Sequence, residues 1–295
     1  MSLKPVTRPL IVAGATGYGV WPDNSLEGAR QCLAAPVDGI EIDVQMTADG
    51  RVVAHHDYWL KPDATRLEGR WLDSRGPPLK TLTLDTLRQY DVGALRPGSD
   101  YAVRYPHRQP LDGVAIPTLE DLLDLLKAAP GPRRLFYIEI KTDPRDPGAA
   151  PDPDTVTNAV MDAVEAAGYA DHTKIIAFDW SVLRRVHARA PTMATAHLTI
   201  PAALAVRVKP GPDGRSPWTD GVDVRDHGGS DLKAIKGHGG MEWSPYYTDV
   251  TEETVAEATA LGLKVGPWGL SKRTDIQRMA ALGVFSSTVS GPNWS

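Results

Sequence analysis

Short apolar segments alternate with amphipathic segments along most of this 295-residue chain. The run Leu10-Ile11-Val12-Ala13 is apolar throughout, which is typical of parallel strands covered on both faces. The amphipathic segments have the three-to-four-residue spacing of helices. Strands are predicted at Leu10–Ala15, Gly39–Met46, Leu135–Lys141, Lys174–Phe178, Met193–Thr199, Met241–Ser244, Leu263–Trp268 and Val284–Val289. Helices are predicted at Ser25–Ala35, Leu119–Ala128, Asp154–Ala167, Trp180–Ala190, Glu252–Leu261 and Thr274–Leu282.

Eight strands with intervening helices predict an α/β fold, the TIM (β/α)8 barrel, which usually needs about 250 residues. An open doubly wound sheet is the alternative. The excess length falls mainly in a weakly periodic stretch rich in Pro and Gly, at about 57–117. We interpret this stretch as an insertion in a single domain over 1–295, because structureless loops of that length are rare. A second irregular stretch runs from Ile200 to Gly240, and Asn24 stands where a helix cap belongs.

A hairpin is predicted directly after the second strand. Thr47-Ala-Asp-Gly50 is a turn signal that joins Gly39–Met46 to a short strand at Arg51–His56. A turn centred on positions 48 and 49 places Glu41 opposite His56, with the two Cβ atoms about 5 Å apart. A register shift of one residue would exchange His56 for His55, because neighbouring strand residues point to opposite faces.

Composition and charge narrow the class of protein without indicating a chemistry. Hydrophobic residues make up 42% and charged residues 23%, as in ordinary globular proteins. A net charge of −5 and a pI near 5.9 provide no basic field for nucleic acid or an anionic membrane. Cys32 is the single cysteine, which excludes an intramolecular disulfide, and no apolar run reaches the ~18 residues of a membrane span. The short, polar start of the chain does not resemble a signal peptide, so we expect a soluble protein, cytoplasmic or periplasmic.

Charged residues at two strand ends are the candidates for chemistry, because barrel enzymes carry their catalytic groups there. Glu41 and Asp43 are two residues apart and therefore share a face, and so do Glu139 and Lys141. Exposed acids and a plain salt bridge are the structural alternatives. Taken together with His56, these groups fit a hard divalent cation, Mg²⁺ or Ca²⁺, and a phosphoryl substrate.

Several segments of the chain resemble the glycerophosphodiester phosphodiesterase family. They include Pro22-Asp-Asn-Ser25, the run Gly39-Ile-Glu-Ile-Asp-Val-Gln-Met-Thr-Ala-Asp-Gly50, and Val53-Ala-His-His-Asp57. Further matches are Glu139-Ile-Lys141, Ala177-Phe-Asp-Trp180, Trp243-Ser-Pro-Tyr246 and Gly262-Leu-Lys-Val-Gly-Pro-Trp268. The resemblance covers almost the whole chain in order, and it implies a TIM barrel that cleaves glycerophosphodiesters with a divalent metal.

The resemblance also implies roles for individual residues. Glu41, Asp43 and Glu139 would bind the metal, His56 would be one of two acid/base histidines, and Lys141 would contact the phosphate. Two tryptophans at strand ends, Trp243 and Trp268, are candidates for the wall of the substrate pocket, although core packing explains them equally well.

The chain departs from the family pattern at the expected pocket mouth. The family has His-Arg-Gly after its first strand, and this chain has Gly14-Ala15-Thr16, so a histidine and a phosphate-binding arginine are missing. Phe285 and Ser290 stand where aspartates are usual, and Ala177 and Gly269 are smaller than expected. Loss of one acid/base group typically lowers the rate about 10²–10⁴-fold.

Three functions are therefore compatible with the sequence. The first is a metal-dependent phosphodiesterase whose activity is reduced or altered. The second is a non-catalytic ligand-binding protein. The third is a pocket remodelled by evolution or engineering, in which Lys141 acts as a nucleophile or His56 as a general base. Among the other histidines, His197 is a strand residue that could face the pocket, whereas His187 and His238 are predicted to be surface or loop residues.

Overall fold

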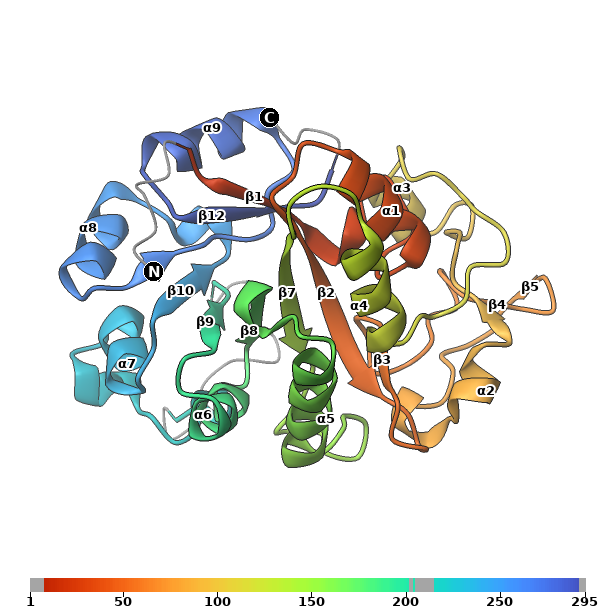
Figure 1. Ribbon diagram of the computed structural model, residues 1–295, viewed down its shortest axis with the longest axis horizontal. Helices are drawn as coiled ribbons and strands as arrows, with labels where there is room; N and C mark the ends of the chain where they lie inside the picture. The colour runs from red at the N-terminus through yellow and green to blue at the C-terminus, as the bar shows by residue number, and fades with distance from the viewer. Residues whose placement is uncertain (1–7, 202–203, 205–214, 292–295) are drawn as a thin grey trace.

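The computed structural model describes residues 8–201, 204 and 215–291, so part of the irregular stretch after Ile200 lies outside the described residues. Eight parallel strands form one sheet in the order β11-β10-β9-β8-β7-β2-β1-β12 (Figure 1). They are β1 (Leu10–Ala13), β2 (Gly39–Met46), β7 (Leu135–Ile140), β8 (Thr173–Ala177), β9 (Ala194–Thr199), β10 (Glu242–Pro245), β11 (Lys264–Val265) and β12 (Ser286–Val289). Each overlaps one predicted strand.

Backbone hydrogen bonds join the two ends of this sheet. Phe285 N donates to Val265 O at 2.8 Å, and Thr288 N donates to Pro267 O at 2.8 Å, so the segment around β11 lies against β12. The first and last strands of the sheet order therefore meet, which an open sheet would not allow. The TIM barrel prediction is confirmed.

Helices follow most of the strands and cover the outside of the barrel (Figure 1). The long ones are α1 (Leu26–Ala34), α4 (Leu119–Ala128), α5 (Pro153–Ala166), α6 (Trp180–Arg189), α7 (Asp231–Gly237), α8 (Glu252–Ala260) and α9 (Arg273–Ala281). Short 3₁₀ turns occur at Gly14–Thr16, Leu79–Thr81, Ala170–His172, Pro217–Thr219, Val224–His227 and Tyr247–Asp249. All six predicted helices are present, and α7 is an additional helix in the stretch predicted to be irregular. No described helix has both the length and the apolar character needed to cross a membrane.

The hairpin exists, but its predicted register was wrong by one residue. Strand β3 (Val52–Ala54) is antiparallel to β2 and pairs Val44 with Ala54. The reason is a three-residue loop, in which Thr47 N donates to Arg51 O at 2.9 Å and Gly50 adopts a φ of +76°. A glycine with positive φ at the end of the loop is typical of three-residue hairpins.

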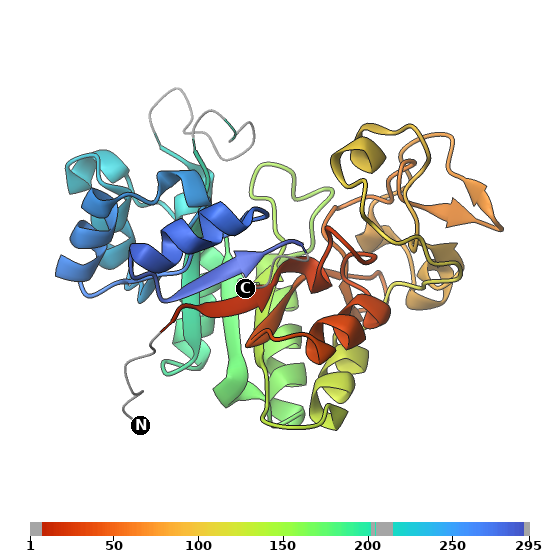
Figure 2. The same ribbon diagram turned by 90° about the horizontal axis from the view of Figure 1, so that it is seen from above.

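The insertion at 57–117 leaves the barrel between β3 and α4 (orange to yellow in Figure 2). It contains a small antiparallel sheet and two short helices: β4 (Arg66–Leu67), β5 (Arg70–Trp71), β6 (Tyr90–Asp91), α2 (Leu84–Leu87) and α3 (Asp100–Arg104). Leu60, Leu79, Leu87 and Ile116 form its own apolar core together with Val53 of β3. Hydrophobic burial therefore holds the insertion to the barrel at the hairpin.

Alternation along the strands separates two apolar layers. Ile40 and Ile42 of β2 lie in the large core cluster that includes buried residues of the outer helices. Tyr137, Ile176 and Leu198 belong to a second cluster, inside the barrel. Residues of β2 and β7 at the alternate positions, among them the predicted site carboxylates, therefore point into the barrel.

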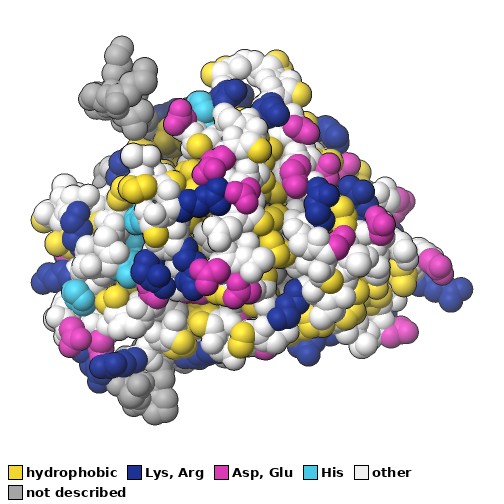
Figure 3. All heavy atoms as spheres, turned by 60° about the horizontal axis from the view of Figure 1, so that its bottom comes forward, with side chains coloured by type: hydrophobic (Ala, Val, Ile, Leu, Met, Phe, Trp, Pro, Cys, Tyr) yellow, Lys and Arg dark blue, Asp and Glu magenta, His cyan; other side chains and the backbone are white. Residues whose placement is uncertain are grey.

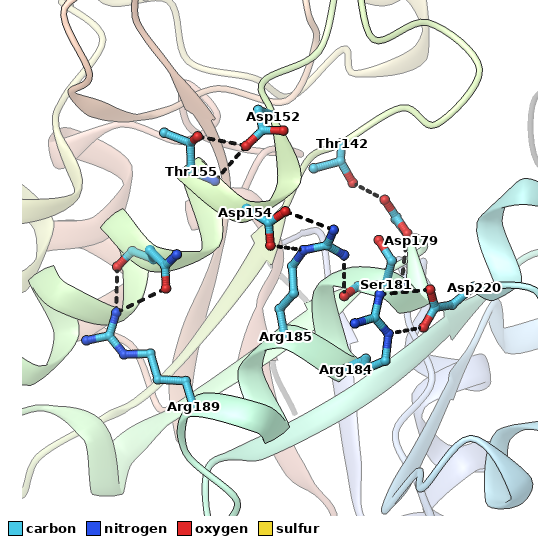
Figure 4. A network of polar contacts seen from close by, with 11 residues as sticks. Thr142, Asp152, Asp154, Thr155, Asp179, Ser181, Arg184, Arg185, Arg189 and Asp220 are labelled. Carbon is cyan, nitrogen blue, oxygen red and sulfur yellow. Dashed lines mark hydrogen bonds and ion pairs between the residues drawn. The ribbon is translucent and has the colours of Figure 1, made fainter.

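Polar contacts tie neighbouring loops at the carboxyl ends of the strands (Figure 4). Thr142 follows β7 and donates to Asp179 Oδ2 at 2.8 Å, and Asp179 also caps α6 by accepting from Ser181 N. Arg185 of α6 contacts Asp154 of α5 at 2.5 Å. Elsewhere on the surface, as in the face shown in Figure 3, acidic and basic side chains are intermixed.

His197 points away from the barrel interior, contrary to the possibility that it faces the pocket. It is fully buried between β9, α6 and α7, where its Nε2 lies 3.0 Å from His238 Nδ1. His238 lies in the turn after α7, as a loop position predicts, but its side chain is only 8% exposed and its Nε2 lies 3.2 Å from Asp220 Oδ2. Alternation explains the orientation, because Leu198, the next residue on β9, is the one that faces inward.

Acid should destabilise the protein partly through His197. Burial, assisted by the neighbouring His238 and His187, lowers the pKa of His197 to about 3. The unfolded chain then binds a proton that the folded chain excludes, so stability falls as pH drops below about 6.5. As the pH falls from about 7.5 to about 5.5, protonation of His197 in the unfolded chain should lower the free energy of unfolding by ~1.4 kcal/mol.

Urea unfolding across this pH range measures the effect. His197→Gln, which keeps a polar group near the Nε2 position, should remove most of this loss. The control His107→Gln replaces an exposed histidine of the insertion and should leave the pH dependence as in the wild type. An unchanged pH dependence in His197→Gln would show that His197 does not titrate this way.

Candidate active site

Three buried carboxylates meet inside the barrel at the carboxyl end of the sheet. Asp43 of β2 is the register neighbour of Glu139 on β7, and Glu41 lies two residues before Asp43. One ligand oxygen from each side chain lies within 4.8 Å of those of the other two. All three are at most 8% exposed. The structure therefore brings together the three residues predicted to bind a metal.

Lys141, just after β7, is held between two of these carboxylates. Its Nζ lies 2.5 Å from Glu139 Oε1 and 2.9 Å from Asp43 Oδ1. Burial opposes the charged form, but Asp43 and Glu139 outweigh burial and raise the pKa of Lys141 well above its ordinary value. An ammonium held in this way is a cationic binding group, and its neighbours oppose the free amine that a lysine nucleophile requires.

Glu41 accounts for the excess negative charge in the cluster. Its Oε2 accepts a hydrogen bond from Ala15 N at 2.7 Å, but Lys141 forms ion pairs with the other two acids and not with Glu41. Burial, and then the charges of Asp43 and Glu139, raise the pKa of Glu41 well above its ordinary value. A hard divalent cation would relieve this repulsion, and carboxylate oxygens are the ligands that Mg²⁺ and Ca²⁺ prefer.

Asn24 orients Asp43, which sequence analysis missed. Its Nδ2 donates to Asp43 Oδ2 and its Oδ1 accepts from Asp43 N, both at 2.9 Å. The backbone of Asn24 has a φ of +53°, and the expected capping role belongs instead to Ser25, whose side chain accepts from Gly28 N. The signal for Asn24 was its place in the Pro22–Ser25 match, since propensity alone indicates only a helix cap.

His56 lies at the edge of the same cluster. The regular ladder of the hairpin ends at Ala54, and this allows His56 to face the carboxylates despite the shifted register. Its side chain is 55% exposed, and Nδ1 lies 3.3 Å from Asp57 Oδ1. Lys141 lowers the pKa of His56, and so does the partial loss of solvent around the ring, but Asp43 and Asp57 outweigh these effects, so the pKa is above its ordinary value. His55 lies elsewhere, with Nδ1 2.8 Å from Asp57 O.

A cavity of about 450 Å³ opens over the carboxylates. Glu41, Asp43, Glu139, Lys141 and His56 line it, with Trp268 and Gly269 in the opposite wall. A second cavity of about 390 Å³ shares His56, Glu139 and Lys141 with the first. The combined space has the size of a small-molecule site and contains every predicted catalytic and metal-binding residue.

Tyr18 and Thr288 occupy the space beside Gly14, the first residue after β1. A Cβ atom on Gly14 would lie 3.1 Å from Thr288 Cγ2 and 3.5 Å from Tyr18 Cε1. Burial is the main cause that raises the pKa of Tyr18, so its hydroxyl keeps its proton, and Ser290 forms a hydrogen bond with it. The space that a side chain at position 14 would enter is thus bordered by the phenol of Tyr18.

Three other expectations about the pocket differ from the structure. Trp243 lies in the core cluster outside the strands and donates to Thr199 Oγ1, so it does not line the cavity. Ala177 also belongs to that outer core. Phe285 precedes β12, and the ammonium groups of Lys174 and Lys264 lie over its ring, at the opposite end of the strands from the site. Trp243 and Ala177 point outward because side chains alternate along a strand, and Phe285 is far from the site because it lies at the start of its strand.

The chain matches a model of the glycerophosphoryl diester phosphodiesterase family over residues 14–286. A glycerophosphodiester phosphodiesterase from Caldanaerobacter subterraneus subsp. tengcongensis is 26% identical over 278 residues, which are 94% of this chain and 92% of that protein. The Bacillus subtilis protein of the same name is 26% identical over 286 residues, covering 94% of this chain and 82% of its own length.

Solved structures agree with this match. A Silicibacter pomeroyi crystal structure assigned to the glycerophosphoryl diester phosphodiesterases has a TM-score of 0.84 and 32% identity, over 98% of this chain and 93% of that one. An Oleispira antarctica phosphodiesterase in complex with the product sn-glycerol 3-phosphate shares the fold, with a TM-score of 0.67, 17% identity, and coverage of 97% and 94%. Since the family match extends across nearly the whole barrel, the chain belongs to the glycerophosphoryl diester phosphodiesterase family.

Proposed function

We propose that this protein hydrolyses a glycerophosphodiester to sn-glycerol 3-phosphate and an alcohol, with Mg²⁺ or Ca²⁺ as cofactor. The observation that carries the proposal is the buried triad of Glu41, Asp43 and Glu139 beneath an open cavity in a chain of this family. Relatives named glycerophosphodiester phosphodiesterase match nearly its whole length. The product in the Oleispira antarctica complex indicates the substrate class.

The residues around the triad have separate roles in this proposal. The divalent ion, when bound, supplies a Lewis acid that stabilises negative charge on the phosphoryl group. Lys141 presents an ammonium to the same charge, and its two carboxylate partners hold it in place. His56, oriented by Asp57, acts as the general acid that donates a proton to the oxygen of the departing alcohol. Asn24 keeps Asp43 turned toward the site.

The altered motif at Gly14 and Ala15 limits the rate in this proposal. A single histidine, His56, must serve proton transfer, because no second histidine lines the cavity in the part of the chain that the structure describes. We therefore expect turnover about 10²–10⁴-fold below that of relatives that have both groups. We also propose that the barrel and the insertion at about 57–117 act as one domain, since both contribute cavity residues.

Release of glycerol 3-phosphate from glycerophosphocholine tests the function. We expect release with Mg²⁺ or Ca²⁺ and none above background with EDTA. Metal binding measured by calorimetry without any release would favour a ligand-binding protein instead. If the protein binds neither metal, phosphodiester hydrolysis is refuted, and a remodelled pocket that uses His56 becomes the better explanation.

A further inference from the structure

Three cationic side chains line the larger cavity, and two of them already form ion pairs. Lys141 contacts Asp43 and Glu139, and Lys61 Nζ lies 2.5 Å from Asp57 Oδ2. Arg104, the last residue of α3, is exposed and forms no ion pair with any described carboxylate. Among the described residues that line this cavity, it is therefore the cation available to an incoming anion.

Once a divalent ion is bound, the positive charges of the carboxylate centre would only balance its negative charges. Its three acids carry three negative charges, and Lys141 with a divalent ion would carry three positive ones. A phosphodiester is a monoanion, so a further positive group facing the cavity would strengthen its binding. The family resemblance implies an arginine for this purpose at the position of Ala15, whose methyl group provides no charge.

Helix α3 is docked against the loop that carries the altered motif. The Tyr105 ring, next to Arg104, packs edge-on against Tyr18 at a centroid distance of 5.3 Å and against Tyr101 at 5.0 Å. Gln109 N donates to Val20 O at 2.7 Å. These contacts place the end of α3 beside the loop after β1, which lies next to the insertion in Figure 2.

Tyr246, from the loop after β10, is a second residue on which the charge of Arg104 acts. Tyr246, just after β10, packs against Trp268 and would contact any Cβ on Gly269. Burial raises the pKa of Tyr246, and the charge of Arg104 opposes that rise. Arg104 therefore lies within electrostatic range of the loop after β10, and it lines the same cavity as Tyr18 and Trp268.

We propose that Arg104 binds the anionic phosphoryl oxygens of the substrate and takes over the role of the arginine absent at Ala15. The proposal rests on the proposed function, because it assigns a group to the same substrate. It makes the insertion part of the substrate site. A guanidinium can donate two parallel hydrogen bonds to one phosphoryl group, which suits this role.

Arg104→Ala should raise the KM for glycerophosphocholine about 10- to 100-fold and change kcat less than about 3-fold. The dissociation constant of sn-glycerol 3-phosphate for the Mg²⁺-loaded protein, measured by calorimetry, should rise by the same factor. Arg104→Lys should restore part of the loss. The control Arg88→Ala removes an exposed arginine from the same insertion, outside the cavity, and should change neither value.

A rescue variant tests whether an arginine at position 15 can replace the one at position 104. Ala15→Arg in the Arg104→Ala background should lower the KM again. If the wild type cleaves the substrate while Arg104→Ala binds and cleaves it equally well, the role of Arg104 is refuted and the proposed function stands. If the wild type neither binds glycerol 3-phosphate nor cleaves the substrate, the proposed function itself fails, and the inference fails with it.

Discussion

Glu41→Gln should lower metal affinity and metal-dependent hydrolysis by on the order of 10²-fold or more, because mutation even of outer-shell partners costs 10–100-fold. The substitution removes one of the three carboxylates that would hold the ion and keeps the size of the side chain. The amide oxygen can still accept the hydrogen bond from Ala15 N, so the loop after β1 should remain in place. Calorimetric titration with Mg²⁺ and the release of glycerol 3-phosphate measure the two losses.

The same variant should be more stable than the wild type when metal is absent. Glu41, Asp43 and Glu139 are buried side by side with Lys141 as the one ammonium among them. Replacing Glu41 by a neutral side chain removes a crowded charge and should raise the unfolding free energy of the EDTA-treated protein by about 1–2 kcal/mol. Glu120→Gln, at an exposed position, is the control. Equal metal affinity of Glu41→Gln and wild type would refute the ligand role.

Lys174→Met should reduce the unfolding free energy by about 3–5 kcal/mol. Lys174 lies inside the barrel below the site and donates to both carboxylate oxygens of Glu242, at 2.7 and 2.6 Å, and to Tyr137 Oη at 2.9 Å. Both charged side chains are at most 8% exposed. Methionine removes the ammonium and leaves Glu242 as a buried carboxylate without its cation.

A double variant distinguishes the unpaired charge from simple loss of packing. Lys174→Met/Glu242→Leu removes both charges and should recover most of the lost stability in urea unfolding. The exposed pair Arg30 and Glu27, 3.6 Å apart on α1, serves as control, and Arg30→Met should cost less than about 1 kcal/mol. If Lys174→Met costs no more than Arg30→Met, the buried ion pair does not contribute as proposed.

Apolar periodicity was sufficient to predict the barrel. Each predicted strand overlaps an observed one, and helix α4 has the predicted bounds of Leu119–Ala128. The reason is that burial on both faces demands continuous apolar runs, and this demand is local in sequence. Helix α7 was missed because Asp231–Gly237 is short and contains charged residues and a glycine, so its pattern is weak.

Local pattern was less informative about side-chain direction. Ala177, Trp243 and Phe285 were expected near the pocket, and their positions on the outer face or at the opposite end of the strands follow from strand phase and direction. The hairpin register depended on one residue of loop length, which the turn signal does not specify. Such errors of one residue reverse the face of a strand.

The sequence by itself determined the order of strands and helices and the pairs of residues at the ends of β2 and β7, Glu41 with Asp43 and Glu139 with Lys141, since these properties belong to neighbouring residues. Only the tertiary structure decided that Glu41, Asp43 and Glu139 share one centre, that Asn24 supports Asp43, and that Arg104 reaches the cavity. Arg104 is 90 residues along the chain from Gly14 in the printed numbering. Contacts of that separation depend on how the insertion docks, and packing, not local propensity, determines docking.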